Sequence, residues 1–309
     1  MKLHPVVFVL GPTAVGKSDF ALAAAKRFSG VLLNCDSVQS YSRVQVGAAK
    51  PDLKTLNEVG HYLWDWVHPP HILTAAEFRR RAILELEHLT QKSPVFAVGG
   101  SGFYVRALMK GLYPVRRVPK ERTLVWRERL KAEGSVRLHE ELQVLDPVYA
   151  QRLSPNDGYR IIRALELIEN EGKSLTTIQA EFEQKAEEWP YRSLKIGLEL
   201  PREELRQRIA VRAEQMLQMG LRQEVEDLLR QDLKEWAPLK SIGYKEVVEG
   251  LAQNWSDKQI QEAIALNTSQ LAKKQMTWFK SDKEIEWFEA RPQWQKPLER
   301  LQEFFSRQD

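Results

Sequence analysis

Val6–Ser18, with the sequence VVFVLGPTAVGKS, decides the fold of this 309-residue chain. The apolar run Val6–Leu10 predicts a buried strand, and the residues after it match the phosphate-binding pattern G-x-x-x-x-G-K-S/T. In such a loop the backbone N–H groups surround an anion, the Lys17 ammonium reaches the terminal phosphate, and the Ser18 hydroxyl is placed for Mg²⁺. An ordinary glycine turn is the weaker alternative. The stretch therefore predicts a loop that binds a di- or triphosphate.

The length and composition of the chain are typical of a globular protein with one large domain or two modest domains. Of its residues 43% are apolar, and no apolar run approaches the ~18 residues of a membrane span, so a cytoplasmic location is expected. The single cysteine, Cys35, excludes an internal disulfide framework and a cluster of thiolate ligands. A net charge of +4 permits a nucleic-acid partner without requiring one.

Strand and helix patterns alternate along the first part of the chain, which predicts an α/β fold with a parallel sheet flanked by helices. The predicted strands are Val6–Leu10, Val31–Asn34, Pro94–Val98, Ser193–Leu200 and Ile285–Phe288, and the predicted helices include Lys17–Phe28, Ala75–Leu89 and Phe103–Leu108. Residues 116–190 are helical and polar. The sequence thus predicts a P-loop core in residues 1–115 and 191–309, interrupted by an all-helical insertion domain at 116–190.

Two polar motifs follow predicted strands and share the sheet edge of the phosphate loop. Asp36-Ser37-Val38-Gln39 follows one strand, and its carboxylate can hold Mg²⁺ through water, act as a general base, or cap a turn. Gly99-Gly100-Ser101-Gly102 follows another, where the glycines allow a ligand to approach the backbone and Ser101 offers a hydroxyl. A tight strand-to-helix turn would also explain those glycines.

Arginines and mixed basic and aromatic residues offer further contacts to phosphates. Arg202, Arg206, Arg208 and Arg212 lie on one predicted helix, which is either a lid over phosphate oxygens or a solvated charged face. Basic residues beside aromatic rings suit an unpaired RNA loop, although each one alone is also typical of an ordinary surface. These are Arg116-Arg117, Trp126-Arg127, Tyr159-Arg160, Arg163, Tyr244-Lys245 and Lys273-Lys274.

Together these motifs resemble the tRNA dimethylallyltransferases of the bacterial type, also called tRNA isopentenyltransferases, over almost the whole chain. The resemblance rests on Gly11–Ser18, Asp36–Gln39 with Tyr41 and Ala49–Pro51, Gly99–Tyr104, Asn156-Asp157 with Arg160–Glu166, Arg208-Ile209 with Arg212, Gly243–Glu246, and Gln275 with Thr277–Phe279. Ser101 stands where the family usually has Thr, and Tyr159 where Gln is common. Both replacements keep a group that can contact substrate.

The resemblance implies transfer of a dimethylallyl group from dimethylallyl diphosphate to N6 of the adenosine next to the 3′ side of the anticodon in tRNA. It implies Asp36 and Ser101 as catalytic residues, with Mg²⁺ at Ser18 as cofactor. The diphosphate would be held by Gly11, Thr13, Ala14, Val15, Gly16, Lys17, Ser18 and Arg212. The tRNA contacts would be Asp36, Ser37, Val38, Gln39, Ser101, Arg127, Tyr159, Arg160, Ile161, Ile162, Arg163, Lys240, Ser241, Ile242, Gly243, Tyr244 and Lys245. A monomer without membrane attachment is expected.

Three other functions fit parts of the pattern. An adenylate isopentenyltransferase would use a free nucleotide as acceptor, but the helical insertion and the match at Asn156–Glu166 favour tRNA. A nucleoside or small-molecule kinase shares the loop, the carboxylate and an arginine lid. An RNA-binding module gated by a nucleotide would show no turnover.

Overall fold

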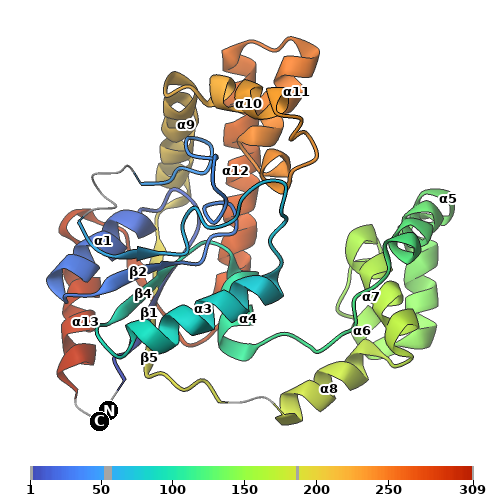
Figure 1. Ribbon diagram of the computed structural model, residues 1–309, viewed down its shortest axis with the longest axis horizontal. Helices are drawn as coiled ribbons and strands as arrows, with labels where there is room; N and C mark the ends of the chain where they lie inside the picture. Colours follow the sequence, from blue (N-terminus) through green and yellow to red (C-terminus); the bar gives the residue numbers. More distant parts are fainter. Residues whose placement is uncertain (1–2, 52–57, 186–187, 308–309) are drawn as a thin grey trace. The chain divides into compact units, whose positions relative to one another are not determined.

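The computed structural model describes residues 3–51, 58–185 and 188–307, which form two compact units (Figure 1). The first unit comprises residues 1–109 and 190–309, and the second comprises 110–189. The division falls at Lys110, slightly earlier than the boundary expected from the sequence, because helix α4 (Gly102–Lys110) ends there.

The first unit contains a sheet of six parallel strands, which confirms the predicted α/β class. The strand order is β3-β2-β4-β1-β5-β6. The strands are β1 (Val6–Leu10), β2 (Val31–Asn34), β3 (His61–Tyr62), β4 (Val95–Val98), β5 (Ser193–Glu199) and β6 (Ile285–Glu289). Strand β1 is central, with Val6 opposite both Val95 and Ser193. The sequence did not predict β3, because two residues are too few to show an alternating pattern.

Helices cover the sheet because its strands are apolar on both faces. In the described residues of this unit the helices besides α4 are α1 (Lys17–Arg27), α3 (Ala75–Leu89), α9 (Arg202–Gln218), α10 (Leu221–Arg230), α11 (Tyr244–Gln253), α12 (Asp257–Lys280) and α13 (Gln295–Ser306), with short 3₁₀ turns at Ala237–Lys240 and Pro292–Trp294. Val7 and Val9 pack in one core with Phe20 of α1 and Leu301 of α13. Neighbouring residues such as Phe8 point to the opposite face.

In Figure 1, helix α12 runs from the region of α10 and α11 toward the sheet. It begins at the predicted capping box, in which Ser256 accepts a hydrogen bond from the backbone N–H of Gln259. Its buried residues include Ile260, Ile264 and Ala272, and it packs along α9. The first unit therefore presents two long adjacent helices, α9 and α12, beside the carboxyl ends of the strands.

The second unit is wholly helical in its described residues, as the sequence predicted. Its helices are α5 (Lys120–Leu145), α6 (Pro147–Ala150), α7 (Gly158–Glu171) and α8 (Leu175–Lys185). Leu138 and Leu142 of α5 pack in one core with Ile161 and Leu165 of α7. Asp146 joins α6 to α8, since its carboxylate accepts hydrogen bonds from the backbone N–H groups of Tyr149 and Thr176.

Over the residues that the structure describes, no helix is long and apolar enough to cross a membrane.

Candidate active site

The loop Gly11–Ser18 connects β1 to α1 at the carboxyl edge of the sheet, as predicted. Gly11 has a φ of +140°, and a Cβ there would lie 2.4 Å from the carbonyl oxygen of Leu198, so glycine is required beside β5. Lys17 donates a hydrogen bond to the carbonyl oxygen of Pro12 at 2.7 Å, which closes the loop. Val15 is buried in the core, so of this residue only the backbone can contact an anion.

Asp36 lies in a turn that Asn34, at the end of β2, holds in place. Asn34 is fully buried; its Oδ1 accepts from the N–H of Asp36 at 2.8 Å, and its Nδ2 donates to the carbonyl oxygen of Asp36 at 3.0 Å. The carboxylate of Asp36 accepts from the N–H groups of Val38 at 2.9 Å and Gln39 at 3.4 Å. Sequence reasoning missed Asn34, although a polar residue ending an apolar strand was a usable signal.

Ser101 lies beside this turn, as the two polar motifs predicted. Its hydroxyl oxygen accepts a hydrogen bond from the backbone N–H of Ser37 at 3.4 Å and lies 3.5 Å from the Ser37 hydroxyl. The amide of Gln39 is used within the protein, since it donates to the carbonyl oxygens of Ala48 and Ala49 and accepts from Trp64. The side chain of Gln39 thus holds the wall of the site formed by residues 48 and 49.

Two cations and one carboxylate share the centre of the site. Burial lowers the pKa of Lys17 to about 8. The nearby carboxylate of Asp36 acts in the opposite direction, and the charge of Arg212 contributes to the lowering. Burial also lowers the pKa of Arg212, while Asp36 and then Asp19 raise it. Buried cations without enough local negative charge attract anions strongly. This cluster is therefore built to receive a ligand with more negative charge than Asp36 supplies.

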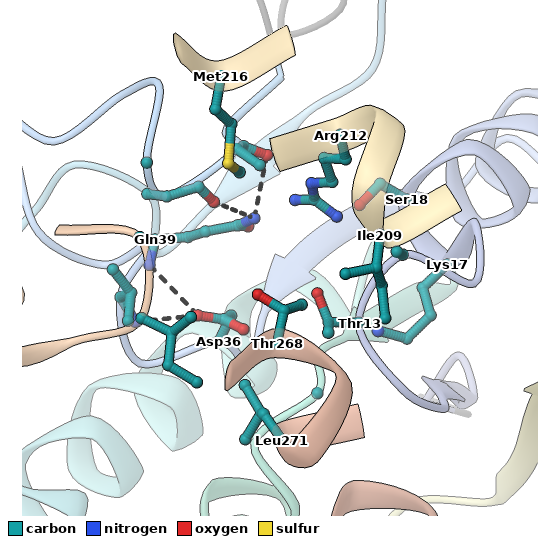
Figure 2. A pocket seen from close by; sticks show the side chains of 18 of the residues that line it. Thr13, Lys17, Ser18, Asp36, Gln39, Ile209, Arg212, Met216, Thr268 and Leu271 are labelled. Carbon is teal, nitrogen blue, oxygen red and sulfur yellow. Dashed lines mark hydrogen bonds between the residues drawn. The ribbon is translucent and has the colours of Figure 1, made fainter. Parts of the chain in front are cut away.

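Lys17, Asp36 and Arg212 line one pocket of about 540 Å³, a volume typical of small-molecule sites. Figure 2 shows Asp36 on one side and Lys17 and Ser18 on the other, with Thr13 and Arg212 between them. Helices α9 and α12 complete the pocket with both polar and apolar side chains, and sequence reasoning missed the apolar part. The apolar side chains are Ile209, Ala213, Met216, Ile264 and Leu271.

Glu224 of α10, which is half-buried, and Tyr244 of α11, which is fully buried, hold a loop that lines the pocket at Gly47 and Ala48. The Glu224 carboxylate accepts from the backbone N–H groups of Gln45 at 3.1 Å and Val46 at 2.8 Å, and from the Tyr244 hydroxyl. The Tyr244 hydroxyl in turn accepts from the N–H of Ala48 at 3.1 Å. Glu224 was also missed, since a single glutamate on a polar helix carries no sequence signal.

Tyr244 has no exposed surface, so the expectation that it contacts tRNA is wrong for its side chain. A fully buried ring cannot stack on a base. Its neighbours are placed differently: Ser241, Ile242 and Gly243 line the pocket. Lys240 and Lys245 are exposed and form ion pairs with Glu235 at 2.8 Å and Glu249 at 3.5 Å.

In the second unit the structure separates the predicted tRNA contacts into exposed and buried residues. Arg127 and Tyr159 are exposed, Tyr159 by 73%. Arg160 and Arg163 form ion pairs with Asp157 and Glu166 on α7 and keep exposed surface. Ile161 and Ile162 are only 0% and 5% exposed and belong to the helical core. The prediction that these two side chains contact tRNA is therefore wrong, since they stabilise α7 instead.

Ser18 and Asp19 fit the predicted magnesium site by their chemistry. Both are exposed and line the pocket at the start of α1, next to Lys17. Hydroxyl and carboxylate oxygens are the ligands that Mg²⁺ prefers, and Mg²⁺ commonly binds through one or two such groups together with substrate phosphates. Magnesium at Ser18 stays a prediction, to which the structure adds Asp19 as a neighbouring oxygen donor.

Known proteins resemble this chain over nearly its full length. The tRNA dimethylallyltransferase of Bdellovibrio bacteriovorus is 49% identical over 94% of this chain and 94% of its own. That of Geobacter metallireducens is 41% identical over 92% of each. The full-length tRNA isopentenylpyrophosphate transferase from Bacillus halodurans is 28% identical, with a TM-score of 0.71 over 98% of this chain and 96% of its own.

A eukaryotic dimethylallyltransferase acting on tRNA has the same fold, with a TM-score of 0.77 and 23% identity over 99% of this chain and 80% of its own. A family model described as IPP transferase matches residues 39–282, which include the Ser101 turn, the arginine helix α9 and all of α12. With the relatives at 41% and 49% identity, this match settles the assignment. The chain belongs to the IPP transferase family.

Proposed function

We propose that this protein transfers a dimethylallyl group from dimethylallyl diphosphate to N6 of the adenosine adjacent to the 3′ side of the anticodon in tRNA, releasing diphosphate. One observation carries the proposal: a carboxylate, Asp36, lies in the same pocket as the lysine of a phosphate-binding loop and a half-buried arginine, Arg212. The names of its relatives support tRNA as the acceptor.

The donor binds with its charged end at the loop. Backbone N–H groups of Ala14–Ser18 at the start of α1, together with the side chains of Lys17 and Arg212, supply positive charge for the diphosphate. Residues of α9 and α12 such as Ile209 and Leu271 supply apolar surface for the five-carbon group. The pocket thus has a charged part and an apolar part, as an allylic diphosphate requires.

The reaction forms a bond between the adenosine N6 and C1 of the dimethylallyl group while the bond between C1 and the diphosphate oxygen breaks. The bonding electrons leave with the diphosphate, where Lys17 and Arg212 stabilise the developing charge. An allylic carbon tolerates partial positive charge, so the weakly nucleophilic amino group suffices. Asp36 accepts the proton that N6 loses, and Ser101 orients the amino group beside it.

Mg²⁺ bound at Ser18 would supply additional neutralisation of the diphosphate oxygens. Ser18 and Asp19 are the residues of this chain that would hold it, directly or through water. The protein's own contribution remains the orientation of the diphosphate by the loop and the exclusion of water by α9 and α12.

The acceptor base must leave the anticodon-loop stack to reach Asp36. Unpaired anticodon nucleotides are suited to stacking on aromatic rings and to contact with arginines. Arg127, Tyr159, Arg160 and Arg163 offer such groups on the second unit, and Lys240 and Lys245 offer charge on the first. We propose these exposed residues as tRNA contacts, and a monomer as the acting species.

The deciding experiment supplies purified protein with Mg²⁺, labelled dimethylallyl diphosphate and an unmodified tRNA carrying adenosines on the 3′ side of the anticodon. We expect label in the tRNA at the adenosine adjacent to the anticodon and one diphosphate released per transfer. A tRNA with guanosine at that position is the matched control and should stay unlabelled.

The competing functions give different results in the same experiment. Label in AMP but not in tRNA would identify a free-nucleotide prenyltransferase. Phosphorylation of a nucleoside by ATP without prenyl transfer would identify a kinase. Binding of tRNA without any turnover would identify a binding module.

A further inference from the structure

Gln275 of α12 connects the two glycine-rich loops of the pocket. Its Oε1 accepts a hydrogen bond from the backbone N–H of Thr13 at 2.8 Å, and its Nε2 donates one to the carbonyl oxygen of Gly100 at 2.9 Å. A side-chain amide is planar and carries its donor and acceptor at a fixed separation. The two bonds therefore set the distance between the loop after β1 and the loop after β4.

Each of these loops carries one half of the proposed chemistry. Thr13 belongs to the loop that holds the diphosphate. Gly100 precedes Ser101, whose hydroxyl accepts a hydrogen bond from the backbone N–H of Ser37, the residue after Asp36. A Cβ on Gly100 would lie 2.5 Å from the Gln275 Nε2, so the amide and this backbone are as close as glycine allows. One side chain thus joins the leaving-group side of the pocket to the proton-accepting side.

The helix that carries Gln275 gives it a rigid base. Ile264, Thr268, Leu271 and Gln275 follow at intervals of four, three and four residues and all line the pocket, so they lie on one face of α12. The same helix packs along α9, which carries Arg212. A residue fixed on a packed helix can hold loops more accurately than a residue on a loop.

We propose that Gln275 is a positioning residue that holds the diphosphate loop and the Ser101 loop at the separation required for in-line transfer. This role rests on the proposed function. A neutral amide neither gains nor loses protons in the working range, so its contribution is geometric. A displacement of about 1 Å between reacting groups can reduce the rate about 100-fold.

The test compares two variants. Gln275→Met fills similar space without hydrogen bonds, whereas Gln275→Glu keeps an acceptor for the Thr13 N–H but places a carboxylate oxygen against the carbonyl oxygen of Gly100. Gln270→Met, at an exposed position of the same helix, is the matched control. The assay measures kcat and the KM of each substrate for dimethylallyl transfer to tRNA. kcat is expressed per donor-binding site counted with labelled donor, so unfolded chains do not affect it.

We expect both Gln275 variants to lose about tenfold or more in kcat while each KM stays within about threefold, and the control to match the unaltered protein. A kcat within twofold for Gln275→Met, or a loss that appears only in the donor KM, would overturn the positioning role. Absence of transfer by the unaltered protein would overturn the proposed function itself, and this role with it.

Discussion

The side chain of Asn34 forms hydrogen bonds with both backbone groups of Asp36: its Oδ1 accepts from the N–H at 2.8 Å, and its Nδ2 donates to the carbonyl oxygen at 3.0 Å. The same amide also donates to the carbonyl oxygen of Leu63 at 3.0 Å, so the turn is tied to the segment after β3. A proposed general base is useful only if its carboxylate stays in place. Here a fully buried neighbour, two residues away, supplies that rigidity.

Asn34→Ala should therefore damage both stability and catalysis. It removes the hydrogen-bond partner of the Asp36 backbone N–H and of the buried Leu63 carbonyl oxygen, so we expect the free energy of unfolding to fall by about 2 kcal/mol or more. Urea unfolding measures this loss, and kcat for transfer should fall with it. A variant with unchanged stability would show that water replaces the amide.

Asp36→Asn should lower kcat by about 10² to 10⁴-fold, because the amide cannot accept the proton from N6. Its Oδ1 still accepts from the N–H groups of Val38 and Gln39, so the turn is retained. The binding of tRNA, measured by filter retention, should stay within a few-fold of the unaltered protein. Loss of tRNA binding instead would assign Asp36 a structural role.

The pH dependence should report Lys17, whose pKa burial lowers to about 8. Lys17 is charged below that pH and neutral above it, so donor binding to the free enzyme weakens as the pH rises. We expect kcat/KM for the donor to fall by up to about tenfold per pH unit above pH 8. Bound diphosphate raises the pKa of Lys17, so kcat at saturation should stay flat to higher pH.

Lys17→Met is the control for this profile. It removes the titrating group, so its kcat/KM should be low and should lack the fall above pH 8. A profile for the unaltered protein that stays flat to about pH 9.5 would show that the free enzyme keeps Lys17 charged.

Tyr244→Phe should reduce stability by about 1 to 2 kcal/mol, because Glu224 and the N–H of Ala48 lose the hydroxyl between them. The KM for tRNA should stay nearly unchanged, since the buried ring makes no contact with tRNA. Thermal unfolding and transfer kinetics measure the two effects. Tyr159→Phe, at an exposed ring, is the matched control and should leave stability unaltered.

Arg127→Ala and Tyr159→Ala should each raise the KM for tRNA about threefold to tenfold without changing the KM of the donor. A lost phosphate contact also reduces the salt dependence of tRNA binding, so this slope should decrease for the arginine variant. Lys131→Ala, on the same helix as Arg127, is the control. Unchanged tRNA affinity in both variants would place the anticodon contacts elsewhere.

The local patterns of the chain predicted most of the fold. Continuous apolar runs such as Val6–Leu10 predicted strands of a parallel sheet, and Ser256 with Gln259 predicted the start of α12. Burial inside a helix is harder to read from sequence. Ile161 and Tyr244 sit beside arginine or lysine, yet both are buried, because each helix turns one side to a core. Adjacent residues in a helix therefore differ in role.

The sequence by itself determined the phosphate-binding loop, the carboxylate after β2 and the helical insertion, because each is encoded within a short stretch by spacing and side-chain type. Tertiary structure alone decided which distant residues meet them. Thr13 and Gln275 are 262 positions apart, and Val46 and Glu224 are 178 apart. Such contacts depend on how α10 and α12 pack on the sheet, and a pairing fixed by packing leaves no periodic signal in the chain.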